Sequence, residues 1–124
     1  MGKTFDWKCP TCGKSWQLRE GHGMNHALLE LVAKEFPPEM RQEVIACAGE
    51  EKWPVFHFNF RPARCVPCGS MVSVPHIEFP KSGKSVTGNC TACGQTVTCE
   101  TEDRVLCPNC GLTHLEKQIA GDWD

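Results

Sequence analysis

The chain has 124 residues, a length that fits one domain or two very small ones, and ten of these residues are cysteines. Its formal charge of −2, from 13 basic and 15 acidic side chains, excludes a positive field over the whole molecule that would attract nucleic acid or an anionic membrane. Apolar residues make up 40% of the chain with the cysteines included, so the core is small. Chains of this kind commonly need metals or disulfides for stability.

The start of the chain carries Lys3, Asp6 and Lys8 and lacks the apolar stretch of a signal peptide. The longest apolar stretch, residues 27–33, is interrupted by Glu30 and is far shorter than the ~20 residues that cross a bilayer. We therefore expect a cytoplasmic protein without a membrane segment. In a reducing cytosol, paired cysteines are more often metal ligands or redox groups than structural disulfides, so disulfides are the less favoured alternative.

Strands and helices follow one another in the first half of the chain. Residues 5–7 and 15–18 have strand-like patterns on either side of the first cysteine pair, which predicts two strands joined by a turn. Apolar residues then recur at helical spacing and predict a helix over about 23–36 and a second over about 38–48. Two prolines separate them, so the pair would form a helical hairpin.

The middle of the chain predicts strands. Phenylalanines alternate with other residues over 55–60, which is typical of a strand with one aromatic face. Residues 71–79 and 84–89 predict a hairpin around the turn signal at 80–83. Because proline donates no backbone hydrogen bond, Pro75 predicts that the first of these two strands lies at an edge or carries a bulge.

The last third of the chain predicts one more hairpin and a short helix. The hairpin would join residues 95–99 to residues 104–107. Thr113 and Glu116 have the spacing of a capping box, which predicts a short terminal helix that stops at Gly121.

One short unit, Cys-x-x-Cys-Gly, occurs four times. Two cysteines at this spacing aim both sulfurs at one point, and the glycine lets the chain turn past a metal. Zn²⁺ takes four ligands in a tetrahedron, so two turns make one closed site of four thiolates and four turns make two sites. We therefore predict two zinc ions, with iron as the less favoured alternative. The predicted ligands are Cys9, Cys12, Cys65, Cys68, Cys90, Cys93, Cys107 and Cys110.

The length of chain between the turns indicates which of them share a metal. Cys93 and Cys107 are separated by 13 residues, enough for a hairpin whose ends return to one place, so we expect the third and fourth turns to share a site. The first and second turns would then share the other site across 52 residues that include both helices. The alternative joins the second turn to the third across 21 residues and leaves the first turn with the last.

Residues 89–112 resemble a zinc ribbon with rubredoxin-type knuckles, and residues 5–73 resemble a second ribbon with a helical insertion. The first half is also similar to the bacterial CpXC domain, which has two such turns around a helical insert and no established function. The resemblance implies a small, metal-dominated α+β fold of two zinc-ribbon β modules. The first, over 1–79, contains the helical hairpin, and the second, over 80–124, ends in the short helix. Because ribbons serve many roles, the resemblance implies fold and metal rather than activity.

The remaining cysteines and histidines have less specific patterns. Cys47 lies on the apolar stripe of the second helix, so we expect it in the core, and we expect Cys99 to pack in the last hairpin. A reactive thiol is the alternative for each. His22 and His26 are four residues apart at a helix start, and we expect them to be solvated rather than to form a third metal site. Because the knuckle cysteines close both sites, we expect no catalytic residue.

These observations favour a non-enzymatic zinc-binding adaptor whose loops and exposed aromatic residues meet a partner protein or nucleic acid. Nucleic acid would be bound by basic residues beside Phe60 and Trp16, which would stack on bases. The basic residues are Arg61, Arg64, Lys81 and Lys84, with Lys8 and Lys14. The tryptophans are Trp7, Trp16, Trp53 and Trp123, and in the alternative reading they cover a shallow core. A rubredoxin-like electron carrier and a subunit of an enzyme are the alternative functions.

Overall fold

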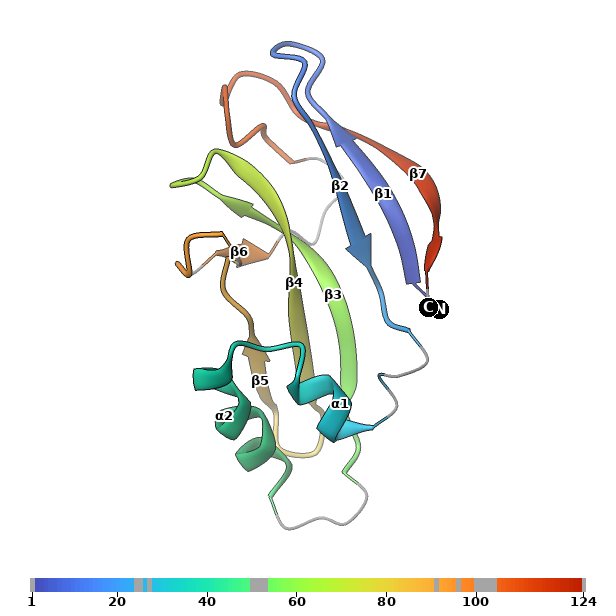
Figure 1. The fold of residues 1–124 in the computed structure, drawn as a ribbon, viewed down its shortest axis with the longest axis vertical. Helices are drawn as coiled ribbons and strands as arrows, with labels where there is room; N and C mark the ends of the chain where they lie inside the picture. Colours follow the sequence, from blue (N-terminus) through green and yellow to red (C-terminus); the bar gives the residue numbers. More distant parts are fainter. Residues whose placement is uncertain are drawn as a thin grey trace.

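A computed structural model describes residues 2–23, 26, 28–49, 54–90, 92–95, 97–99 and 105–123. Within these residues the chain forms a small α+β fold with two antiparallel sheets and two short helices (Figure 1). The elements, in chain order, are β1 (Gly2–Lys8), β2 (Ser15–Glu20), α1 (Leu29–Ala33), α2 (Pro38–Ala48), β3 (His57–Cys65), β4 (Ser70–Phe79), β5 (Lys84–Thr87), β6 (Thr98–Cys99) and β7 (Glu116–Trp123).

The first sheet has the strand order β2-β1-β7, with both neighbouring pairs antiparallel. Trp7 lies opposite Trp16 across the β1–β2 pair, which confirms the two strands predicted around the first cysteine turn. On the other side of β1, Gly2 lies opposite Trp123 of β7. The first and last strands of the chain therefore lie side by side (Figure 1).

The predicted terminal helix is wrong, because Glu116–Trp123 forms strand β7. A capping interaction contributes about 1 kcal/mol, which is less than a full backbone ladder with β1 and the burial of the preceding Leu115 can supply. Gly121, the predicted helix stop, lies instead at a register shift, where Thr4 pairs with Gly121 and Phe5 pairs with Ile119.

The second sheet has the strand order β5-β4-β3-β6. The predicted hairpin of residues 71–79 and 84–89 is present as β4 and β5, although β5 ends at Thr87. The predicted aromatic strand is present as β3, with Phe58 and Phe60 buried in the core. The predicted last hairpin is not found as such: β6 pairs with β3, and residues 100–104 lie outside the described residues.

Pro75 lies in β4, which is an internal strand and has no bulge against β3, so the prediction of an edge or bulged strand is wrong. Pro75 lies opposite Phe60 of β3, and the backbone N–H and carbonyl of Phe60 are bonded to Gly21 on the other side of that strand. Phe60 and Pro75 therefore form a non-hydrogen-bonded pair of the β3–β4 ladder. The proline nitrogen therefore faces β5, whose ladder with β4 begins only at His76. The lack of an N–H group on Pro75 therefore removes no hydrogen bond from the β3–β4 or β4–β5 ladder.

The two helices lie between β2 and β3 in the chain and cover one face of the second sheet. α2 has the predicted bounds, whereas α1 is shorter than the predicted helix, whose first residues fall partly outside the described ones. Neither described helix has the length and apolar character needed to span a bilayer. Val32, Phe36 and Val44 pack with Phe58 in one core cluster, which also includes Ile77.

A second core cluster lies under the first sheet and contains cysteines. Trp7, Leu18 and Leu115 pack there around Cys9 and Cys107. The two sheets are joined by the backbone bridge between Gly21 and Phe60. Each sheet takes strands from both sides of the predicted boundary at 79/80, and the division into two modules stays a prediction.

Candidate metal centres

The structure gathers the eight knuckle cysteines into two groups of four, and within each group all the sulfurs lie within 4.8 Å of one another. We call one group the terminal cluster, which consists of Cys9, Cys12, Cys107 and Cys110. We call the other group the central cluster, which consists of Cys65, Cys68, Cys90 and Cys93. The expected pairing of the turns is therefore wrong, and the alternative pairing is the one observed.

Strand pairing explains this arrangement. Because β7 lies along β1, with Lys8 opposite Glu116, the first and fourth turns meet at one end of the first sheet. In the second sheet, Cys65 lies opposite Ser70 at the turn of the β3–β4 hairpin, and β5 then leads the chain back towards Cys90. The short stretch between the third and fourth turns therefore joins the two clusters instead of closing one of them.

Each turn ends in a glycine with positive φ, from 61° to 78°, a conformation that glycine adopts without strain. In three turns the glycine N–H donates a hydrogen bond to the carbonyl of the first cysteine, at 2.8 to 3.0 Å. In the turn that begins at Cys65, Gly69 donates instead to the carbonyl of Val66 at 3.1 Å. The backbone N–H of Cys12 also points at the Cys9 sulfur, at 3.5 Å. Local backbone geometry thus directs both sulfurs of a turn to one side.

The sulfur spacing fits a tetrahedral metal. Four sulfurs at ~2.3 Å from one Zn²⁺ lie ~3.8 Å from each other. The distances across the clusters are 3.6 Å for Cys9–Cys110, 3.9 Å for Cys12–Cys107, 3.6 Å for Cys65–Cys93 and 3.9 Å for Cys68–Cys90. A disulfide would need ~2.05 Å, and all eight thiols are free. The donor set and its spacing therefore suit Zn²⁺, and four sulfurs also suit iron.

Ionisation differs between the thiols of the terminal cluster. The backbone N–H of Cys12 favours the Cys9 thiolate, but burial and the thiols of Cys12 and Cys110 outweigh it and raise the pKa of Cys9 to about 11. At Cys12, the backbone N–H of Lys14 opposes burial and, with further hydrogen bonds, lowers the pKa to about 7. Cys9 would thus need a cation beside it to lose its proton at neutral pH.

The central cluster has the same contrast. Hydrogen bonds with the thiols of Cys93 and Cys65, together with burial, raise the pKa of Cys68 to about 12. Burial opposes ionisation of Cys90, but the backbone N–H groups of Cys93 and Ala92 lower its pKa to about 7. Cys68 would again need a cation beside it to become a thiolate at neutral pH.

The clusters have no free position for a reacting water. Each offers four cysteine donors, which complete a tetrahedron, whereas a catalytic zinc keeps one position open. Among the described residues, no other group of three or more potential metal ligands converges on a point. Cys47 is half-buried against the helix-covered core, as expected, and the side chain of Cys99 lies outside what is described.

The histidines lie apart from both clusters, and two of them are not solvated. His26 is buried, and its ring lies 4.5 Å from that of Phe58, so the expectation that it is solvated is wrong. Only His22 of this pair is exposed, and neither histidine lies within α1. His76 is also buried, with its two ring nitrogens 2.7 Å from Thr87 Oγ1 and 3.0 Å from a Glu78 carboxylate oxygen.

One of the two aromatic residues of the predicted nucleic-acid surface is buried, and the surface itself stays a prediction. Phe60 is only 5% exposed, so it is not available to stack on a base. Arg61 forms an ion pair with Glu78 at 3.2 Å. Lys81 and Lys84 lie on the surface beside the β4–β5 turn.

The tryptophans mostly belong to the core. Trp7 is fully buried, so a role for it as an exposed contact is wrong. Trp16 and Trp123 are half-buried, and Trp53 lies outside the described residues. The buried position of Trp7 follows from its place on the central strand of the first sheet, whose inner face covers the second core cluster.

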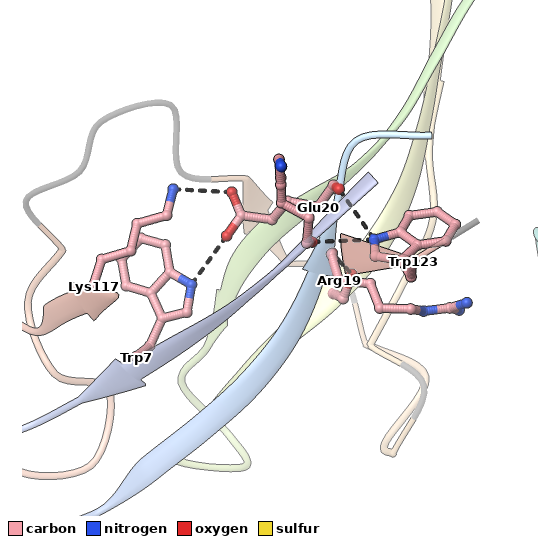
Figure 2. A network of polar contacts seen from close by, with 7 residues as sticks. Trp7, Arg19, Glu20, Lys117 and Trp123 are labelled. Atoms are coloured by element: carbon pink, nitrogen blue, oxygen red, sulfur yellow. Dashed lines mark hydrogen bonds and ion pairs between the residues drawn. The ribbon is translucent and has the colours of Figure 1, made fainter. Parts of the chain in front are cut away.

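Sequence reasoning did not find the polar network around Glu20 (Figure 2). Its carboxylate accepts hydrogen bonds from Trp7 Nε1 at 3.1 Å and from Lys117 Nζ at 3.0 Å. Its backbone carbonyl accepts a hydrogen bond from Trp123 Nε1 at 3.3 Å, and the Arg19 guanidinium lies 5.0 Å from that indole ring. The network joins β2 to β7, and no local sequence signal marks a contact between strands so far apart in the chain.

Comparison of the chain with known protein families, with curated proteins and with solved structures finds no match. The description of the two centres therefore depends on the chemistry of the donors and on the sulfur spacing. Both point to two sites able to hold a metal ion with four cysteine ligands each.

Proposed function

We propose that this chain is a non-enzymatic zinc-binding protein with two structural Zn²⁺ sites, each in a zinc-ribbon-like pair of knuckles. The observation that carries the proposal is the spacing of 3.6 to 3.9 Å between sulfurs across each cluster, which matches a tetrahedron of thiolates around one ion. Bound Zn²⁺ would supply a crosslink between distant segments and would take no part in a reaction.

The energetics support a structural role. A four-ligand zinc site contributes roughly 10–16 kcal/mol of apparent binding free energy in small peptides, whereas a typical domain has a net stability of only ~5–15 kcal/mol. The terminal cluster joins the first and last strands of the chain, and the central cluster fastens the β3–β4 hairpin to the segment after β5. Two such crosslinks compensate for a small apolar core.

Native mass spectrometry with elemental analysis tests the proposal. The purified chain is expected to carry two zinc ions. The double variants Cys12→Ser/Cys110→Ser and Cys68→Ser/Cys93→Ser are each expected to carry one ion, whereas the control Cys47→Ser, outside both clusters, keeps two. A folded wild-type chain without bound metal, or one with disulfides between these cysteines, would overturn the proposal.

An adaptor role in the cytoplasm is the function that we propose for these sites. It is supported by large apolar side chains exposed beside the knuckles, Val66 at 66% and Leu112 at 77%, because exposed apolar residues on rigid turns suit contact with a partner protein. A photo-crosslinking residue at either position is expected to capture the same partner in cells, and one at the exposed Ile119 serves as the control. Equal capture from all three positions would contradict a specific surface.

The four-sulfur geometry also favours iron as a second candidate, which would make the chain a rubredoxin-like electron carrier. Visible absorbance separates the two candidates. A ferric protein with four thiolate ligands is red, whereas the zinc protein is colourless, and we expect the colourless form.

A further inference from the structure

A turn of one cluster lies beside a turn of the other. A Cβ atom placed on Gly69, at the end of a central-cluster turn, would lie 3.6 Å from Asn109 Oδ1 and 3.8 Å from the carbonyl oxygen of Pro108. These are van der Waals distances, and Pro108 and Asn109 lie in a turn of the terminal cluster. The backbone that holds one set of sulfurs therefore lies within about one carbon atom of contact with the turn that holds the other.

Asn109 belongs to a ligand-bearing turn of the terminal cluster, between Cys107 and Cys110. Its side chain thus lies in a turn of the terminal cluster and beside the glycine that closes a turn of the central cluster. Thr11, Pro67 and Ala92 occupy the equivalent position in the other three turns.

A buried side chain makes a second connection. Met71, in β4, follows Cys68 by three residues and is only 2% exposed. It packs in the core cluster that contains Cys9 and Cys107, the two buried sulfurs of the terminal cluster. The strand that leaves the central cluster therefore forms part of the surroundings of the terminal cluster.

Building on the two zinc sites proposed above, we propose that the clusters bind metal cooperatively and that Asn109 is the positioning residue that links them. An ion in the central cluster fixes the turn that carries Gly69 and the start of β4. Asn109 and Met71 are then already in place around the terminal cluster. An ion that binds there therefore has less of the chain to order. The linkage is reciprocal, because each ion raises the affinity for the other by the same factor.

Zinc titration of the metal-free full-length chain, followed by native mass spectrometry, gives the first test. Two independent sites leave at least half of the chains with one ion when half of the sites are filled, whatever the ratio of their affinities. Cooperative sites leave fewer one-ion chains than two independent sites would, with the affinities of those independent sites measured in the single-cluster variants Cys12→Ser/Cys110→Ser and Cys68→Ser/Cys93→Ser, and this is the expected result. A one-ion population equal to or above the independent value would overturn the proposal, whereas a chain that binds no zinc would overturn the sites themselves.

A double-mutant cycle then tests Asn109. With the central cluster intact, Asn109→Ala is expected to lower the zinc affinity of the terminal cluster by about 10–100-fold, measured by competition with a chromophoric chelator. With the central cluster disabled by Cys68→Ser/Cys93→Ser, the same substitution is expected to have an effect at least about fivefold smaller. Thr11→Ala, at the equivalent position in the other turn of the terminal cluster, is the matched control and is expected to have the same effect in both backgrounds.

If Asn109→Ala lowers the zinc affinity by the same factor in both backgrounds, Asn109 acts only within its own cluster and its linking role is overturned. That role is also overturned if the effect of Thr11→Ala on the affinity depends on the background in the same way. Both experiments report on metal occupancy, so they do not depend on any activity of the chain.

Discussion

Glu20 lies at a largely buried polar contact that joins the three strands of the first sheet. Its carboxylate receives charge-assisted hydrogen bonds from the Lys117 ammonium and from the indole of Trp7, and the side chains of Glu20 and Lys117 are only 14% and 18% exposed. Glu20→Gln keeps the shape of the side chain but removes its charge and places an amide NH2 group, a donor, opposite one of the two donors, so one of these hydrogen bonds is lost. We expect it to lower the free energy of unfolding by about 1.5–3 kcal/mol, measured by urea denaturation of the zinc-loaded chain.

The Lys3–Asp122 pair provides the matched control, because it also joins β1 to β7 but its side chains are 53% and 70% exposed. Asp122→Asn should change the free energy of unfolding by less than about 1 kcal/mol. Equal effects of the two substitutions would mean that burial does not strengthen the Glu20 contacts.

His26 makes the stability depend on pH. Burial lowers the pKa of His26, although Glu35, 3.5 Å from Nε2, acts in the opposite direction. The Gly23 N–H donates to Nδ1 at 2.8 Å, which requires the neutral ring. Because the unfolded chain binds this proton more readily, the free energy of unfolding should fall as the pH falls below about 6.5 towards the lower folded pKa.

Urea denaturation at about pH 7.5 and about pH 5.5, with zinc loading verified at both, measures this dependence. His26→Gln should remove part of the loss of stability at the lower pH, since a glutamine oxygen can accept the Gly23 hydrogen bond without becoming charged. His22→Gln alters an exposed residue and should keep the wild-type dependence. If His26→Gln and the wild type lose the same free energy, the buried ring is not the titrating group.

At the scale of elements, chain length between ligands predicts which cluster binds zinc more tightly. Cys68 and Cys90 are separated by 21 residues and Cys12 and Cys107 by 94. In a chain that folds as it binds metal, closing the longer loop costs about 1.3 kcal/mol more, which corresponds to about tenfold in affinity. We therefore expect the first zinc ion to protect the central cysteines.

Alkylation of free thiols during a zinc titration, followed by peptide mass mapping, locates that first ion. In chains that carry one ion, Cys68 and Cys93 should be protected while Cys12 and Cys110 are modified. All four are exposed or half-buried in the structure, so differences in labelling report metal binding rather than access. Protection of the terminal cysteines first would contradict the argument from loop length.

The elements also show what the sequence could and could not predict. The grouping of the knuckle cysteines into candidate metal sites, α2 and the β4–β5 hairpin were predictable because their signals are local: a spacing, a period and a turn. The pairing of the clusters depends on β7 lying along β1, a contact between opposite ends of the chain. Thr113 and Glu116 have a local helix signal, and the backbone ladder outweighs it.

In the molecule as a whole, the two core clusters depend on metal to different degrees. The cluster under the first sheet includes the ligands Cys9 and Cys107 among its buried members, whereas the buried members of the helix-covered cluster include no knuckle cysteine. Removing zinc would leave the two buried thiols of Cys9 and Cys107 without a metal inside the first of these cores. The helix-covered core would lose only the crosslink at the end of the β3–β4 hairpin.

Metal removal should therefore unfold the first sheet before the second. Hydrogen exchange measured by mass spectrometry after treatment with a strong chelator is expected to show loss of protection in β1, β2 and β7, with slower loss in β3, β4 and α2. The circular dichroism of the chain should fall in step, because the strands of the first sheet have no other covalent or metal link between them. Unchanged protection and an unchanged spectrum after verified metal removal would mean that apolar packing alone maintains this fold, in conflict with the small core that the sequence provides.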